Sequence, residues 1–154
     1  MSTLYPWEVR QQITERITAL SPDASYQQLA TDAWIETKAP LIPEIMPDTL
    51  SNLAFFCDDR ALRLLTGRQS AADGLRVEAT VIVRFLYRLR TQTRVDDWDR
   101  AAKAAHALVV QLDGWQPADF DLYLENSAID RQVLTDFVAV SLRFTVQYFA
   151  PTGA

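Results

Sequence analysis

The sequence predicts an α+β fold, in which helices pack on one face of a mainly antiparallel sheet. Two long segments alternate apolar and polar side chains, which is the pattern of half-buried antiparallel strands. Two other segments repeat apolar residues every three or four positions, which is the pattern of amphipathic helices. The chain has 154 residues, of which 49% are hydrophobic, so we expect a single domain over residues 1–154.

Residues 1–38 are expected to form an N-terminal helical part. Pro6 suits the first turn of a helix, and the apolar residues that follow it predict a helix from Pro6 to Leu20. A similar spacing between residues 26 and 34 predicts a second, shorter helix that includes Trp34. The apolar stripe of the first helix is Val9, Ile13, Ile17 and Leu20.

Residues 39–52 are rich in proline and are expected to form an extended arm. Prolines at positions 40, 43 and 47 exclude a regular helix or a central strand. The apolar residues between them favour docking against a surface, either of the same domain or of a neighbouring molecule. The subunit-interface candidates of the arm are Leu41, Ile42, Ile45 and Met46.

Residues 53–149 are expected to hold the sheet and an amphipathic helix. An apolar run over 53–57 predicts a short strand, a turn is predicted at Asp58 and Asp59, and residues 60–66 are predicted to pair back. The strongest pattern is the strict alternation over residues 76–90, which predicts a long strand. One of its faces is wholly apolar, and the other is basic.

The second half of this region predicts one helix and two strands. Apolar spacing from residue 98 to 112 predicts a helix that Asp96 or Asp97 caps and that Gly114 ends. A short strand is predicted over residues 121–125, and a second long strand over residues 133–149.

Charge is separated along the chain, whose formal net charge is −5. Residues 1–59 carry three bases and nine acids, residues 60–94 carry eight arginines and two acids, and residues 96–136 carry three bases and nine acids. This pattern fits pairing within the molecule, and it equally fits a basic surface that meets an acidic surface of the next subunit. Nucleic-acid binding is a weaker third interpretation, because the whole chain is acidic.

The basic face of the strand at 76–90 is therefore a candidate subunit interface. Two aliphatic residues interrupt its charges, and we expect them to be exposed apolar contacts between arginines. The candidates on this face are Ile82, Arg84, Leu86, Arg88 and Arg90.

Residue chemistry points to no catalytic site. Cys57 is the only cysteine and His106 the only histidine, which excludes Cys/His zinc clusters and histidine-based triads within one chain. The glycines stand singly, so there is no phosphate-binding loop or dinucleotide fingerprint. We expect no catalytic residue, no cofactor and no metal. We also expect no membrane span and no signal peptide.

Residues 76–148 resemble the tail terminator (tail completion) proteins of long-tailed bacteriophages and related contractile particles. The resemblance lies in the long strand from Arg76 to Phe85, the helix that begins at Trp98, and the strand from Val138 to Val146. The early helix over residues 9–17 also looks like the first element of this family.

The resemblance implies a tail-terminator-like fold and a structural virion protein rather than an enzyme. Such a protein forms a homo-oligomeric ring, with six members in this family, on the last ring of the tail tube. The ring ends tube polymerisation and offers a surface to head–neck proteins, at the head-proximal end of the tail. An acidic chain also suits a lumen that DNA passes without binding. The alternatives are another head–tail connector (neck) protein, or a small ligand-binding or enzymatic α+β domain.

Overall fold

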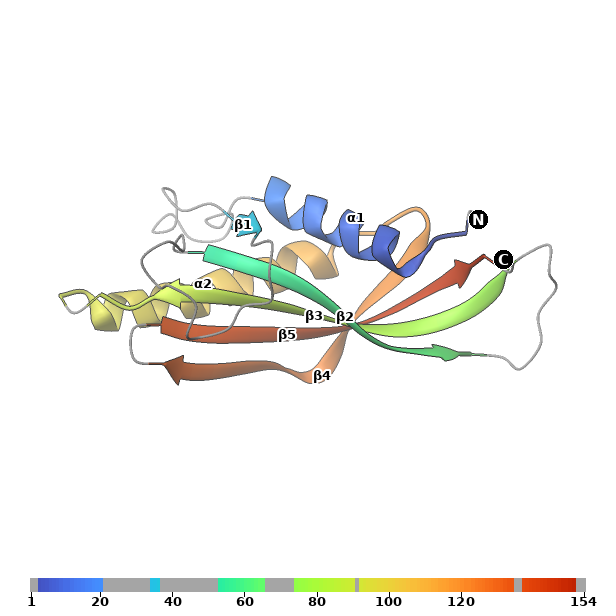
Figure 1. Ribbon diagram of the computed structural model, residues 1–154. Helices are drawn as coiled ribbons and strands as arrows, with labels where there is room; N and C mark the ends of the chain where they lie inside the picture. The colour runs from blue at the N-terminus through green and yellow to red at the C-terminus, as the bar shows by residue number, and fades with distance from the viewer. Residues whose placement is uncertain are drawn as a thin grey trace.

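A computed structural model gives the structure of the protein (Figure 1). It describes residues 3–20, 34–36, 53–65, 74–90, 92–134 and 137–151, with the backbone alone at residues 60–61 and 126–134. The predicted α+β class is confirmed. In chain order the elements are α1 (Pro6–Ala19), β1 (Trp34–Glu36), β2 (Leu53–Leu64), β3 (Leu75–Arg88), α2 (Arg94–Asp113), β4 (Phe120–Leu134) and β5 (Phe137–Ala150).

The described strands form one five-stranded sheet in the order β1-β2-β3-β5-β4. Only the pair of β1 and β2 is parallel, and the other neighbouring pairs are antiparallel. Strands β3 and β5 pair along their whole length, from Leu75 opposite Ala150 to Arg88 opposite Phe137. The two long strands predicted from alternation therefore form the centre of the sheet.

Both helices pack on the same face of the sheet, which we call the covered face (Figure 1). Alternate residues of β3 and β5 point to this face and form one apolar cluster with both helices. Buried alanines on α2 allow that helix to approach the strands closely. The central buried side chains are Val81, Val83, Phe85 and Tyr87 of β3 with Val140, Leu142, Phe144 and Val146 of β5.

The turn predicted at Asp58 and Asp59 is wrong, because β2 runs through both residues. The two carboxylates point to opposite faces of the sheet, and each lies near a different arginine. Asp58 Oδ2 lies 4.0 Å from Arg84 Nη1, and Asp59 Oδ1 lies 3.7 Å from Arg10 Nη1. The pairing with β3 shifts only further along, between Arg60 and Leu62.

Two other element predictions need correction. Trp34 begins strand β1 instead of ending a helix, because its ring packs edge-on to Phe85 with 5.0 Å between centroids. Strand β4 extends to Leu134 and takes in Val133, which was predicted to belong to the last strand. A register irregularity between Leu124 and Ile129 breaks the alternation that would have revealed its length.

The helix predicted from Pro6 is confirmed, and so is the end of α2 before Gly114. Helix α2 begins at Arg94, earlier than predicted, so neither Asp96 nor Asp97 is its N-terminal cap. The remainder of the predicted second helix, over residues 21–33, lies outside the described residues, as does the whole arm over residues 39–52.

Candidate subunit interface

The face of the sheet opposite the helices holds the predicted interface residues of β3, and we call it the open face. Its β3 members alternate with those of the covered face, as the sequence predicted. On β5 the partners of these seven residues are Phe149, Gln147, Thr145, Arg143, Ser141, Ala139 and Phe137. The β3 members are Arg76, Glu78, Thr80, Ile82, Arg84, Leu86 and Arg88.

Ile82 and Leu86 are not exposed, so this part of the prediction is wrong. Their exposed fractions are 5% and 3%. In the sheet Ile82 lies between Asp58 and Arg143. Long arginine side chains cover apolar neighbours with their methylene groups, which explains how aliphatic residues become buried on a charged face.

Two of the predicted interface arginines have partners within the molecule. Arg84 Nη1 lies 4.0 Å from Asp58 Oδ2, across the β2–β3 pair. The Arg88 guanidinium lies 5.7 Å from the centroid of the Phe137 ring. These contacts favour intramolecular pairing for this basic stretch, the first of the interpretations that the charge pattern left open. Both side chains remain partly exposed, so a neighbouring molecule can still reach them.

Arg90 lies beyond the sheet and fixes the start of α2. Its backbone N–H donates to Asp97 Oδ2 over 2.8 Å, and its Nη1 lies 3.5 Å from Asp97 Oδ1. The same carboxylate accepts from the Thr93 hydroxyl over 2.8 Å and lies 3.7 Å from Arg100 Nη1. Asp97 is fully buried, so this cluster is part of the fold. Arg90 was predicted as a subunit-interface residue of the basic face; its side chain is 45% exposed, and that role stays a prediction.

A second cluster joins three strands at the other end of the open face. Glu78 accepts from Arg63 Nε over 2.9 Å and from Gln147 Nε2 over 3.0 Å. Arg76 Nη2 donates to Gln147 Oε1 over 3.3 Å. The hydrogen bond from Arg63, followed by that from Gln147, lowers the pKa of Glu78, which therefore stays charged near neutral pH.

A third cluster joins β4 to β5. Glu125 Oε1 accepts from the Thr145 hydroxyl over 3.0 Å, and Glu125 Oε2 lies 4.0 Å from Arg143 Nε. Tyr123 lies on the same face, opposite Thr145, and is 51% exposed. Sequence reasoning missed this tyrosine, because the strand that carries it was predicted only as a short run with Leu122 and Leu124 on one side.

Several large apolar side chains are exposed on elements far apart in the chain. Most of them could not be predicted from the sequence pattern, because they lie near the ends of elements or just past an irregularity. Among the described residues these are Tyr5, Trp7, Ile35, Leu62, Leu64, Val95, Val110 and Tyr123. Patches of this kind mark contact sites when they lie together.

The arm candidates Leu41, Ile42, Ile45 and Met46 lie outside the described residues, so their role at an interface stays a prediction.

The residues with the most reactive side chains are far from these clusters. Cys57 is buried on the covered face, and burial raises the pKa of its thiol to about 12, although a hydrogen bond with Thr14 acts in the opposite direction. His106 is exposed on α2. Within the described ranges no three His, Cys, Asp or Glu side chains come close enough to hold a metal ion. Neither described helix is long and apolar enough to cross a membrane.

No model of a known protein family matches this chain, and no curated protein matches it.

Proposed function

We propose that this protein is a structural virion protein, a tail terminator that forms a ring on the last ring of a phage tail tube. The observation that carries the proposal is the arrangement of residues 75–150. There the long strand β3, the amphipathic helix α2 and the long strand β5 follow in the order on which the sequence resemblance rests, and β4 lies between α2 and β5 in the chain. In this role the protein ends tube polymerisation and joins the tube to head–neck proteins.

The surface supports an assembling subunit. Exposed apolar side chains occur on α1, on the far part of β2 and on β4, and these positions lie on different sides of the sheet. A ring needs two different patches on each subunit, because every copy contacts one neighbour with each. The proposed partners are further copies of the chain, the tail tube protein and head–neck proteins, with DNA passing through the lumen unbound. The proposed place is the head-proximal end of the virion tail.

The proposal is tested by adding the purified protein to a tail tube protein that polymerises by itself. Electron microscopy of tubes with and without the protein measures tube length and the state of the tube ends. We expect shorter tubes with a ring at one end, and a protein mass that corresponds to several copies. Tubes of unchanged length with bare ends would contradict the proposal. Binding to a purified head–neck protein without any effect on tubes would favour another head–tail connector instead.

A further inference from the structure

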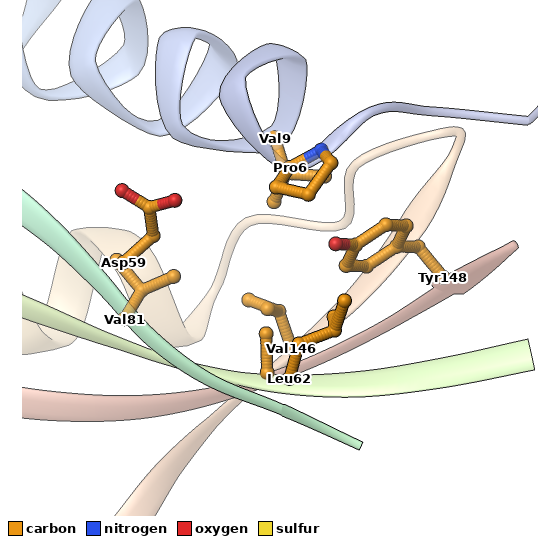
Figure 2. A pocket seen from close by; sticks show the side chains of 8 residues that line it. Pro6, Val9, Asp59, Leu62, Val81, Val146 and Tyr148 are labelled. Atoms are coloured by element: carbon orange, nitrogen blue, oxygen red, sulfur yellow. The ribbon is translucent and has the colours of Figure 1, made fainter. Parts of the chain in front are cut away.

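A hollow of about 200 Å³ lies between the first turn of α1 and strands β2, β3 and β5 (Figure 2). Most of its wall is apolar, and Asp59 is the one charged residue among the described side chains that line it. The hollow lies on the covered face, under the first turn of α1 (Figure 2). The lining residues are Pro6, Val9, Asp59, Leu62, Ala79, Val81, Val146 and Tyr148.

The sequence creates this hollow through an irregular strand and small side chains. The register shift of β2 between Arg60 and Leu62 puts Leu62 opposite Ala79, on the covered face. Ala79 leaves room where its neighbours on β3 carry larger side chains. Leu62 is 56% exposed, so the hollow opens at the surface of the molecule.

The Tyr148 hydroxyl is the unusual group in this hollow. The side chain is only 2% exposed, and the hydroxyl has no hydrogen-bond partner within the described part of the chain. Figure 2 shows the ring reaching from β5 with its hydroxyl pointing into the hollow, toward the side where Asp59 lies. A buried hydroxyl without a partner is unfavourable, so an occupant that supplies one gains binding energy.

The wall defines the chemistry of a suitable occupant. Burial and, less strongly, the charge of Asp59 raise the pKa of Tyr148, so its phenol keeps its proton and can donate it. The Asp59 carboxylate, of which one oxygen lies 3.7 Å from Arg10 Nη1, accepts hydrogen bonds, and the apolar wall disfavours a charged occupant. An uncharged aromatic hydroxyl meets both requirements, since it accepts from one group and donates to the other. The hollow is also smaller than the roughly 300–1,000 Å³ of drug-sized ligand pockets.

Among the described residues, one exposed side chain has that chemistry and no ring stacked on it. Tyr123 projects from the open face of β4 and is half exposed. Tyr5, which is also partly exposed, is stacked against Trp7 with 4.2 Å between ring centroids. Tyr123 and the hollow are on opposite faces of the sheet, so they cannot meet within one copy.

We infer that Tyr123 of one copy inserts into the hollow of the next copy, where its hydroxyl bonds to Tyr148 and Asp59. The contact joins the open face of one subunit to the covered face of its neighbour. Two different patches then meet at every contact, which is the kind of interface that closes into a ring. The inference rests on the proposed function in one respect, because it names the contact that would hold that ring together.

Single substitutions test the two halves of the contact by sedimentation equilibrium, with urea unfolding as the check on folding. Tyr123→Ala should weaken self-association at least about 30-fold, as the loss of a central aromatic anchor does. Tyr123→Phe and Tyr148→Phe remove only a hydroxyl and should weaken it about 2- to 10-fold. The control Val110→Ala removes an equally exposed apolar side chain from α2 and should change nothing.

Tyr148→Phe separates this role from a structural one. Because the hydroxyl has no partner within the described residues, its removal should leave the unfolding midpoint of the monomer unchanged or raise it. A lower midpoint together with unchanged association would overturn the inference.

A mixing experiment tests the direction of the contact. Leu62→Glu blocks the hollow but keeps Tyr123, whereas Tyr123→Ala keeps the hollow. Each variant alone should remain a monomer, and an equimolar mixture should form a dimer and no larger species. Leu64→Glu, at an exposed position two residues along the same strand, is the matched control and should assemble as the wild type does. Two variants that both assemble normally, or a mixture that stays monomeric, would overturn the inference.

The result is separable from that of the proposed function. A wild-type chain that stays monomeric but still caps tubes would overturn the Tyr123 contact and leave the tail-terminator proposal standing. Assembly through Tyr123 without any effect on tubes would support the contact and contradict the tail-terminator role.

Discussion

The covered face and the open face of this sheet consist of alternate residues of the same strands, yet they differ in what holds them together. On the covered face Val83 and Phe85 are fully buried against other apolar side chains. On the open face Arg84, between them in sequence, faces Asp58 at 4.0 Å with both side chains partly exposed. Apolar burial stabilises a fold strongly, whereas exposed ion pairs contribute about 0–1 kcal/mol each. We therefore expect substitutions of the charged residues on the open face to leave the fold intact.

The largest expected effect belongs to the covered face. Phe85→Ala should lower the free energy of unfolding by about 3–5 kcal/mol, because it leaves a cavity beside Trp34 and Val140. Urea unfolding measures the change. The neighbouring open-face variant Arg84→Ala serves as the control, with an expected loss of about 1 kcal/mol or less. Equal losses of unfolding free energy in the two variants would contradict the view that the covered face contributes more to stability than the open face.

Leu86→Ala sharpens the comparison, because this residue is apolar and buried on the open face. Its side chain is 3% exposed between Ala54 and Ala139. We expect a loss of about 2 kcal/mol, the low end of the range for replacing a buried leucine with alanine. A loss as large as that of Phe85→Ala in urea unfolding would mean that the open face holds a second core.

The Asp97 cluster tests the interpretation of Arg90 as part of the fold. Asp97→Ala leaves the Arg90 backbone N–H and the Thr93 hydroxyl without their acceptor, so we expect a loss of about 2 kcal/mol. Asp97→Asn keeps an oxygen acceptor and should lose less. Thermal unfolding of both variants gives the comparison. Wild-type stability of Asp97→Ala would contradict the view that this cluster holds the start of α2.

A smaller effect is the contribution of Glu78 to stability, which depends on pH. Its pKa lies below the ordinary value of 4.5 in the folded protein, so its contribution to stability is complete above that value and is lost as pH falls through the lowered pKa. Glu78→Gln should therefore be less stable than the wild type at pH 7, and the difference should shrink in acid. Unfolding midpoints between pH 7 and pH 3 measure it. A difference that is constant over this range would contradict the hydrogen bonds from Arg63 and Gln147.

The fold could be predicted where a single periodicity runs through an element. Strict alternation identified β3 and β5 and sorted their residues onto the correct faces, and helical spacing identified α1 and most of α2. Strand β4 could not be predicted in full, because the polar run over residues 125–127 and the register irregularity beside it break the period. Strand β1 has only three residues and no pattern of its own.

The candidate site was predictable only in part. Alternation placed Ile82 and Leu86 on the charged face, but their burial depends on neighbours from two other strands. The hollow depends on α1, β2 and β5 converging, and no local pattern contains that information. The Asp97 cluster could not be predicted, because it depends on the turn between β3 and α2, which places Arg90 beside Asp97.

The central claim is that the buried apolar side chains of the covered face maintain the fold, while partly exposed side chains of the open face serve assembly and can be replaced without unfolding the protein. The double variant Arg84→Glu with Arg88→Glu tests it most directly, by mass measurement under conditions in which the wild type assembles. We predict a folded monomer, with a free energy of unfolding within about 2 kcal/mol of the wild type, because only partly exposed charge contacts are lost. A double variant that forms the same assembly as the wild type would contradict the claim.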